Sequence, residues 1–178
     1  MRCVTVADVD GDGKPEVLCG GNDQQIHLLD AAGKEIRSHK MVERLIVGQG
    51  GTTLPYVNCL LAADLDGDGR VEIAAGCTNS QLSVFDPAFK RLGNTGGIFH
   101  GCRRLDAADM NGDGKREILA ANHYGSVQLF SAACRLLGSV YSELGNVAFD
   151  VTELGGKPAL VNGSSTGACA AGVPGQRP

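Results

Sequence analysis

The chain has 178 residues, 43% of them hydrophobic, and a formal net charge of −4 at pH 7. This length allows one domain with a buried core, and no stretch approaches the roughly 18 consecutive apolar residues of a membrane span, which excludes a transmembrane helix. The modest charge, without any lysine and arginine cluster, argues against a nucleic-acid partner, and 26 glycines with no tryptophan are typical of a turn-rich β protein.

Three units with the same internal order follow one another along the chain. In the first, an apolar segment at 3–7 precedes an acidic loop at 8–16, a continuous apolar run at 17–19 follows, and an alternating segment begins at Ile26. A continuous apolar run predicts a strand buried on both faces, and alternation of apolar and polar residues predicts a strand with one face more exposed to solvent. A weaker outer strand is expected near 35–37. The second unit repeats this order at 57–63, 73–75, 82–84 and 91–92, and the third at 105–108, 118–121, 127–129 and 136–140.

The spacing of the units predicts the architecture. The acidic loops begin at Asp8, Asp64 and Asp109, so their starts are 56 and 45 residues apart, and the longer interval contains a Gly/Thr/Pro-rich connector around 48–55. Four-stranded units that recur every 40–50 residues or so are typical of β-propeller blades. Here each acidic loop belongs to one such unit. We therefore expect an all-β fold, a β-propeller with four-stranded blades at about 1–45, 56–95 and 101–141.

A fourth unit is only partly present. Asp150-Val151 resembles the start of a loop and 156–163 echoes 13–20, but Thr152, Leu154 and Ala159 stand where acidic residues are expected. We predict a partial fourth blade at 146–163 without an ion site, and a disordered tail of small and polar residues at 164–178. Because closed propellers have about four to eight blades, we expect an incomplete ring, which is either a fragment of a longer protein or a half-ring that self-associates through its open blade edges.

The acidic loops have the composition of a cation site. Oxygen side chains recur at positions 1, 3, 5 and 9 of each loop, and glycines at positions 4 and 6 allow the chain to curl around an ion. Carboxylates at this density repel one another unless a cation lies among them, and the carbonyl at position 7 is free to turn inward. Calcium, which takes about six to eight oxygens in flexible geometry, suits such a loop better than magnesium. Three Ca²⁺ sites are predicted, with the ligands Asp8, Asp10, Asp12, Lys14 and Glu16 in the first loop, Asp64, Asp66, Asp68, Arg70 and Glu72 in the second, and Asp109, Asn111, Asp113, Lys115 and Glu117 in the third.

Two other interpretations of these loops are weaker. An EF-hand needs a bidentate glutamate at position 12 and a following helix, but position 12 is Cys19, Ala75 or Ala120 and strand-like sequence follows. An ordinary polar hairpin turn would account for one Asp-Gly-rich loop, but not for three loops with the same ligand positions. We expect the ion to stabilise the structure, because metal binding adds to the free energy of folding.

The second loop with its flanks, Ala63 to Gly76, resembles the FG-GAP/VCBS-type repeat of integrin α-subunit propellers and of many bacterial surface and secreted proteins. The likeness covers about residues 1–163. Because the Phe-Gly and Gly-Ala-Pro elements of the integrin form are missing, the chain is more similar to the bacterial type. The resemblance implies β-propeller blades with calcium in the loop between the first two strands, held by the aspartates and glutamates named above and by Asn111, and an extracellular role such as adhesion.

The cysteines allow two interpretations. None forms a Cys-x-x-Cys motif, which argues against a zinc or redox site, and an odd number cannot all pair internally. Cross-strand disulfides Cys3–Cys19 and Cys59–Cys77 are conceivable because these residues flank the first two loops, whereas small thiols buried in strands are the simpler interpretation. The seven residues are Cys3, Cys19, Cys59, Cys77, Cys102, Cys134 and Cys169.

The sequence shows no catalytic constellation. The histidines have no metal-ligand spacing, and neither a Gly-x-Ser-x-Gly elbow nor a phosphate-binding glycine loop occurs. Every aspartate cluster is assigned to calcium, which leaves no carboxylate pair for glycoside hydrolysis. We therefore predict a calcium-stabilised binding or scaffold module for a protein or glycan ligand, without catalysis of its own. The histidines are His27, His39, His100 and His123.

The alternative function is the propeller portion of a larger polysaccharide-acting enzyme such as a lyase. A concave cluster of His100, Arg103 and Arg104 would favour it, because a lyase needs a basic residue beside a carbohydrate groove.

The N terminus runs directly into a repeat and leaves no room for a secretion signal, so the sequence gives no compartment. The predicted calcium sites favour a parent protein that is secreted or on the cell surface.

Overall fold

A computed structural model describes residues 1–41, 54–98, 101–122, 125–141, 146–154, 157–164 and 169–172. Over these residues the regular elements are all β-strands, which form four antiparallel sheets. Among them there is no helix of the length and apolar character needed to cross a membrane. The prediction of an all-β protein is confirmed.

Each sheet is an up-and-down meander in chain order. The first contains β1 (Cys3–Ala7), β2 (Glu16–Gly20), β3 (Gln25–Leu29) and β4 (Glu35–Lys40). The second contains β5 (Val57–Ala63), β6 (Glu72–Cys77), β7 (Leu82–Phe85) and β8 (Arg91–Thr95). The third contains β9 (Cys102–Ala108), β10 (Glu117–Asn122), β11 (Ser126–Phe130) and β12 (Leu136–Tyr141), and the fourth β13 (Asn146–Leu154), β14 (Lys157–Ser164) and β15 (Cys169–Gly172).

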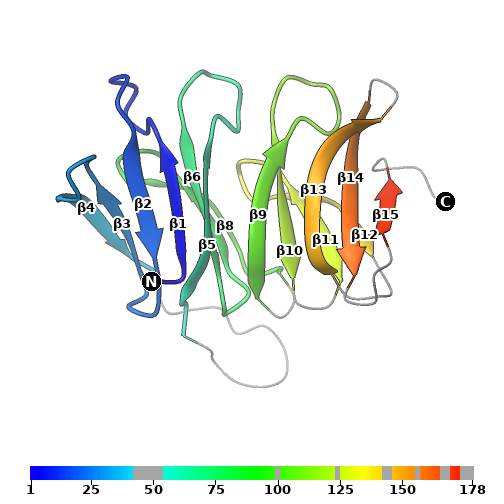
Figure 1. Cartoon of the computed structure of the whole chain (residues 1–178), viewed down its shortest axis with the longest axis horizontal. Helices are drawn as coiled ribbons and strands as arrows, with labels where there is room; N and C mark the ends of the chain where they lie inside the picture. Colours follow the sequence, from blue (N-terminus) through cyan, green and yellow to red (C-terminus); the bar gives the residue numbers. More distant parts are fainter. Residues whose placement is uncertain are drawn as a thin grey trace.

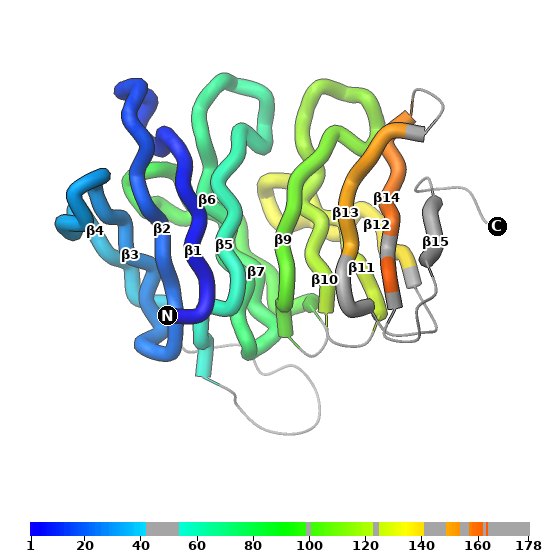
Figure 2. Tube along the Cα trace, viewed as in Figure 1, coloured from blue at the N-terminus to red at the C-terminus, as the bar shows by residue number. Residues whose placement is uncertain are grey.

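The sheets stand side by side like propeller blades (Figure 1). Their first strands, β1, β5, β9 and β13, form a row on one side of the molecule, and the outer strands β4, β8 and β12 lie behind them (Figure 1). Strand β5 contacts both β1 and β9, and β9 contacts β13. The first and fourth sheets lie at opposite ends of the array, and the ring stays open (Figure 2). Three four-stranded blades and a partial fourth are thus confirmed.

Apolar side chains fill the space between neighbouring blades. Leu18 and Ile26 of the first blade pack into one cluster with Phe85 of the second. Equivalent clusters join the second blade to the third and the third to the fourth. Strands β6 and β10 are buried along their whole length, as their continuous apolar runs predict, because each has a blade on both sides.

Strand β2 differs from this prediction. Its residues alternate between buried and half-buried, and Val17 and Cys19 are among the half-buried ones. Both lie on the face of the first blade that has no neighbour in the array. The expectation of burial on both faces is therefore wrong for 17–19, because the local sequence does not encode whether a preceding blade is present.

The fourth blade also corrects two predictions. Strand β13 continues to Leu154, which pairs with Lys157, and Asp150 lies within the ladder opposite Val161. Asp150 is therefore not the start of a loop. The tail is not disordered at Cys169–Gly172, because these residues pair with β14 as a third strand. Their small side chains carry little strand propensity, and the neighbouring strand supplies the pairing. The rest of the predicted tail beyond Ser164 lies outside the described residues.

Candidate metal centre

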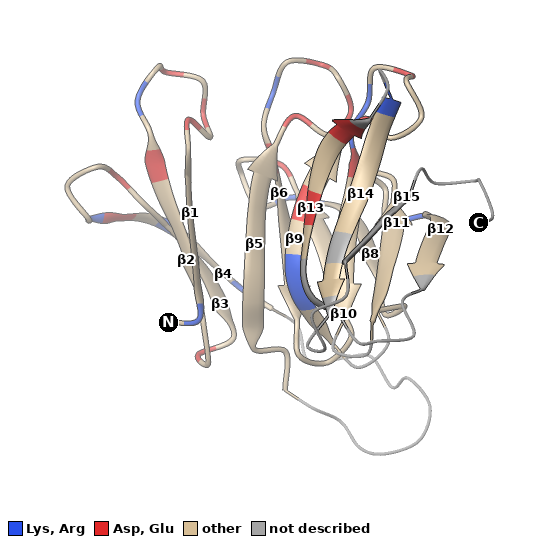
Figure 3. Cartoon of the chain, turned by 45° about the vertical axis from the view of Figure 1, so that its right-hand side comes forward, with Lys and Arg blue, Asp and Glu red and all other residues tan. Residues whose placement is uncertain are grey.

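The three acidic loops connect the first two strands of each four-stranded blade and lie at the same end of the molecule (Figure 1). Acidic segments recur there, whereas the basic segments on β9 and beside the N terminus lie nearer the other end (Figure 3). The glycines at positions 4 and 6 have positive φ in every loop, for example 77° at Gly11 and 85° at Gly13. Glycine adopts this conformation without the strain of a side chain, so the predicted curl is present.

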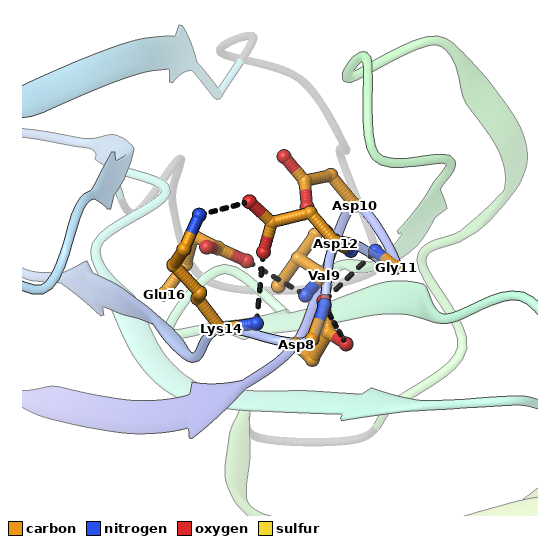
Figure 4. A network of polar contacts seen from close by, with 8 residues as sticks. Asp8, Val9, Asp10, Gly11, Asp12, Lys14 and Glu16 are labelled. Carbon is orange, nitrogen blue, oxygen red and sulfur yellow. Dashed lines mark hydrogen bonds and ion pairs between the residues drawn. The ribbon is translucent and has the colours of Figure 1, made fainter.

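The curl lets each carboxylate accept hydrogen bonds from the loop's own backbone (Figure 4). In the first loop, Oδ1 of Asp8 accepts from the N–H of Gly11 at 2.8 Å and Oδ2 accepts from Gly13 at 2.9 Å. Oδ1 of Asp10 accepts from Asp12 at 3.1 Å. The second loop has the same bonds at Asp64 and Asp66. The acidic side chains are therefore held in place around the loop.

A buried glutamate fixes each loop to the core. Val9, only 2% exposed, inserts into the cluster between the first two blades, and its N–H donates to Oε2 of Glu16 at 2.8 Å. Glu16 begins β2 and is itself buried. The pairs Leu65–Glu72 and Met110–Glu117 make the same 2.8 Å contact. The apolar residue at position 2, which the sequence analysis did not single out, thus sets the position of the glutamate at position 9.

Two of the loops gather three carboxylates each. Oxygens of Asp8, Asp10 and Glu16 lie within 4.8 Å of one another, and so do oxygens of Asp64, Asp66 and Glu72. Burial, and the negative charges of the neighbouring aspartates, raise the pKa of Glu72. Hard oxygens in a partly buried, mutually repelling group fit a divalent cation such as calcium.

The aspartate at position 5 has a different partner in the first loop. Oδ2 of Asp12 accepts from Nζ of Lys14 at 3.1 Å, and Oδ1 accepts from the N–H of Lys14 at 2.8 Å. These bonds, with the side-chain bond the stronger cause, lower the pKa of Asp12. In the second loop Asp68 accepts from the N–H of Arg70 at 2.8 Å. The structure therefore groups positions 1, 3 and 9, while ligation by position 5 and by the position-7 carbonyl stays a prediction.

The third loop is weaker as a cation site. Asn111 replaces an aspartate, and its Nδ2 donates to Oε1 of Glu117 at 2.9 Å and to Oδ2 of Asp113 at 3.2 Å. Backbone N–H groups, that of Gly114 first, lower the pKa of Asp109. An amide hydrogen thus takes the place that a cation would have beside Glu117. Turning the amide of Asn111 by 180° would present an oxygen instead.

The described histidines lie away from these loops. His27 forms ion pairs with Asp23 at 2.8 Å and with Glu35 at 2.6 Å. His39 packs against the rings of Phe85 and Phe89. His100 and His123 lie outside the described residues.

Strand register excludes the two disulfides that the sequence made conceivable. Cys3 lies opposite Gly20 rather than Cys19, and Cys59 lies opposite Gly76 rather than Cys77. Neighbouring positions on a strand point to opposite faces, so neither pair can meet. The structure shows free thiols at Cys3, Cys19, Cys59, Cys77, Cys102 and Cys134, and the last four are buried, as the simpler interpretation predicts.

A second feature is a basic pocket of about 420 Å³ between the first strands of three blades. Arg2, Arg103 and Arg104 line it. Nη1 of Arg2 donates to Oδ1 of Asn58 at 2.6 Å, and its guanidinium lies 5.2 Å from the ring centroid of Tyr56. The sequence analysis missed Arg2, because only the fold brings it to the two arginines of β9.

Comparison with known proteins agrees with this architecture. A search of curated proteins found no match. The chain is similar to the computationally designed Ika4 protein, whose crystal structure superposes with a TM-score of 0.68 at 14% sequence identity, covering 97% of this chain and 89% of that one. At this identity the likeness shows the fold alone. The family model of the FG-GAP-like repeat matches residues 8–75 and 64–120, which include all three acidic loops. The chain therefore belongs to the FG-GAP-like repeat family.

Proposed function

We propose that the chain is a calcium-stabilised β-propeller module that binds a protein or glycan and has no catalysis of its own. The observation that carries this proposal is the recurrence of one three-carboxylate group between the first two strands of successive blades. A site that recurs at the same structural position in successive blades suits a role in stability better than a role in a single reaction.

The ion would act on the loops that the buried glutamates anchor. Asp8, Asp10 and Glu16 would hold it in the first loop, and their equivalents in the second. In the third loop Asp109, Glu117 and the amide oxygen of Asn111 would do so. Calcium would offset the repulsion among these groups and thereby join the end of one strand to the start of the next. Binding to the folded state alone adds about 2.7 kcal/mol per site at a hundredfold excess over Kd.

Isothermal titration with CaCl₂ tests this part of the proposal. We expect calcium binding at three sites, with one site lost in Glu72→Gln, because the amide keeps an oxygen for the Leu65 N–H but removes the charge. Glu153→Gln, which changes an exposed glutamate on β13, serves as the matched control. Absence of calcium binding by the wild-type chain would refute the assignment.

The ligand surface that the charges favour is the basic pocket. Arg2 is held by neutral amides and an aromatic ring, so its charge has no carboxylate partner among the described residues. Arg104 lies 4.8 Å from the ring centroid of Phe149, and its Nη2 is 3.4 Å from Oδ2 of Asp106. Side chains positioned in this way suit carboxylate or sulfate groups of a glycan or protein. An array of acidic glycans tests this surface. We expect the wild-type chain and the control variant Lys90→Gln to bind the glycans, and Arg2→Gln to lose this binding.

The second candidate function is the propeller portion of a polysaccharide lyase. It is favoured by Arg103 and Arg104, which line one pocket. His100, the third residue of the predicted cluster, lies outside the described residues. Incubation of the intact parent protein with acidic polysaccharides separates the two candidates. Binding without cleavage supports the binding module, whereas unsaturated sugar products, detected by their ultraviolet absorbance, support the lyase.

The proposed setting is a parent protein that is secreted or displayed on the cell surface. The calcium loops support it, because sites of modest affinity fill where calcium is abundant. Detection of the native protein in the culture medium or on intact cells would test the setting.

A further inference from the structure

Two thiols from neighbouring blades meet in the interior. Cys59 on β5 and Cys102 on β9 place their Sγ atoms 3.2 Å apart. Both residues are buried, and Cys102 has no exposed surface. A disulfide has a bond length of about 2.05 Å, so an approach of little more than 1 Å would bring the two sulfurs to bonding distance.

A glycine on the neighbouring strand β6 leaves room for both sulfurs. A Cβ atom at Gly76, the next-to-last residue of the buried strand β6, would lie 2.5 Å from Sγ of Cys102 and 2.7 Å from Sγ of Cys59. Glycine weakens a strand interior and marks a place where another group approaches closely. Here the approaching groups are the two sulfur atoms.

The repeat provides an internal comparison for this site. Gly20 occupies the same position in the first blade, twelve residues after the start of the loop. A Cβ atom there would lie 3.3 Å from Sγ of Cys3 and 2.6 Å from Cγ1 of Val57. The first interface therefore packs one cysteine against a valine, and the second packs two cysteines. The pair at Cys59 and Cys102 is a property of this one interface and not of the repeat in general.

We propose that Cys59 and Cys102 form a disulfide that joins the second and third blades when the chain folds with a disulfide oxidant such as oxidised glutathione. One thiolate attacks the oxidant and releases one reduced glutathione, and the second thiolate displaces the other from the mixed disulfide. The two cysteines together lose two protons and two electrons, and the oxidant is reduced to two thiols.

The environment of the pair determines when this exchange occurs. The hydrogen bond with Cys102, followed by burial, raises the pKa of Cys59 well above the usual range for a thiol. A buried thiol with a raised pKa forms little thiolate and reacts slowly. The exchange therefore takes place while the two blades dock during folding, and the finished bond is shielded from reductants.

Peptide mapping after refolding tests the proposal. The full chain is refolded in a glutathione redox buffer, alkylated with N-ethylmaleimide, digested and analysed by mass spectrometry. We expect a peptide that links Cys59 to Cys102, and a higher Tm for the oxidised chain than for the reduced chain. Protein that is reduced and already folded should form the link more slowly than refolding protein.

Two variants distinguish the bond from a general effect of oxidation. Cys102→Ser should abolish both the linked peptide and the rise in Tm upon oxidation. Cys134→Ser, which changes another buried thiol near the same interface, should keep both. Refolded wild-type protein with Cys59 and Cys102 fully alkylated, or with either one linked to another cysteine, would overturn the proposal. This outcome is read from the wild-type chain and does not require a variant to fold.

Discussion

The glycine in β6 shows how one residue supports an interface between blades. We predict that Gly76→Ala destabilises the chain by about 1–3 kcal/mol, because the new methyl group would overlap the sulfurs of Cys59 and Cys102. Gly138→Ala on β12 is the control, since nothing lies within 4 Å of its added Cβ atom. Urea unfolding of both variants measures the difference. Equal stability of the two variants would show that the sulfurs move aside without cost.

His27 makes the stability of the first blade depend on pH. Hydrogen bonds with Glu35 and then Asp23 raise its pKa above the ordinary value of about 6.5. Its contribution to the free energy of unfolding is therefore complete below about pH 6.5 and lost as the pH rises through the folded-state pKa. The same contact lowers the pKa of Glu35, so stability falls again in acid.

We predict that the destabilisation caused by His27→Gln is largest between about pH 4 and pH 6.5 and declines above that window. Chemical unfolding of both proteins across this range measures it. Burial, followed by the charge of Arg91, lowers the pKa of His39, which has the opposite effect on stability. Both proteins contain His39, so its effect cancels in the difference. A difference between the proteins that does not change with pH would contradict the role of His27.

At the scale of elements, equivalent positions of the repeat differ because their neighbours differ. Ile118 on β10 is fully buried against the second blade, whereas the equivalent Val17 on β2 is half-buried on the free face of the first. We predict that Ile118→Ala costs about 2–5 kcal/mol and Val17→Ala about 1 kcal/mol or less. Equilibrium unfolding of the two variants is the measurement. A large loss in Val17→Ala would indicate that the free face is covered in solution.

The sequence predicted the elements within each blade well, because that signal is local. Apolar runs after each loop and alternation beginning at Ile26, Leu82 and Val127 correspond to the observed strands β2, β3 and their equivalents. The environment of each blade was not predictable in this way. Nothing near Val17 encodes the absence of a neighbouring blade, and nothing near Cys59 encodes the approach of Cys102 from a strand 43 residues away.

The candidate site was predictable in part. The spacing of the loops identified the carboxylates that the structure brings together at Asp8, Asp10 and Glu16. The pairing of Asp12 with Lys14 depends on the conformation of the curled loop, which the spacing does not give. Arg2 reaches the basic pocket only because β1, β5 and β9 lie side by side in the folded molecule.

At the scale of the whole molecule, the open array leaves apolar surface at one end. Val4 and Val6 on β1 are 56% and 60% exposed, whereas Leu105, which is equivalent to Val4, is 8% exposed in the third blade. Self-association through the open ends of the array remains a prediction. Multi-angle light scattering over a range of concentrations would detect it, and a single monomeric species throughout that range would contradict it.

Thermal unfolding with and without calcium is the most direct test of the account. Scanning calorimetry of the full chain in a chelator, and then in rising free calcium, should show a Tm that increases with the calcium concentration. Each kcal/mol of binding energy raises the Tm of a domain of this size by about 2–4 °C. Magnesium should have a smaller effect than calcium, and Glu72→Gln should reduce the increase more than Glu153→Gln does. A Tm that is the same in calcium and in chelator would contradict the claim that calcium stabilises these blades.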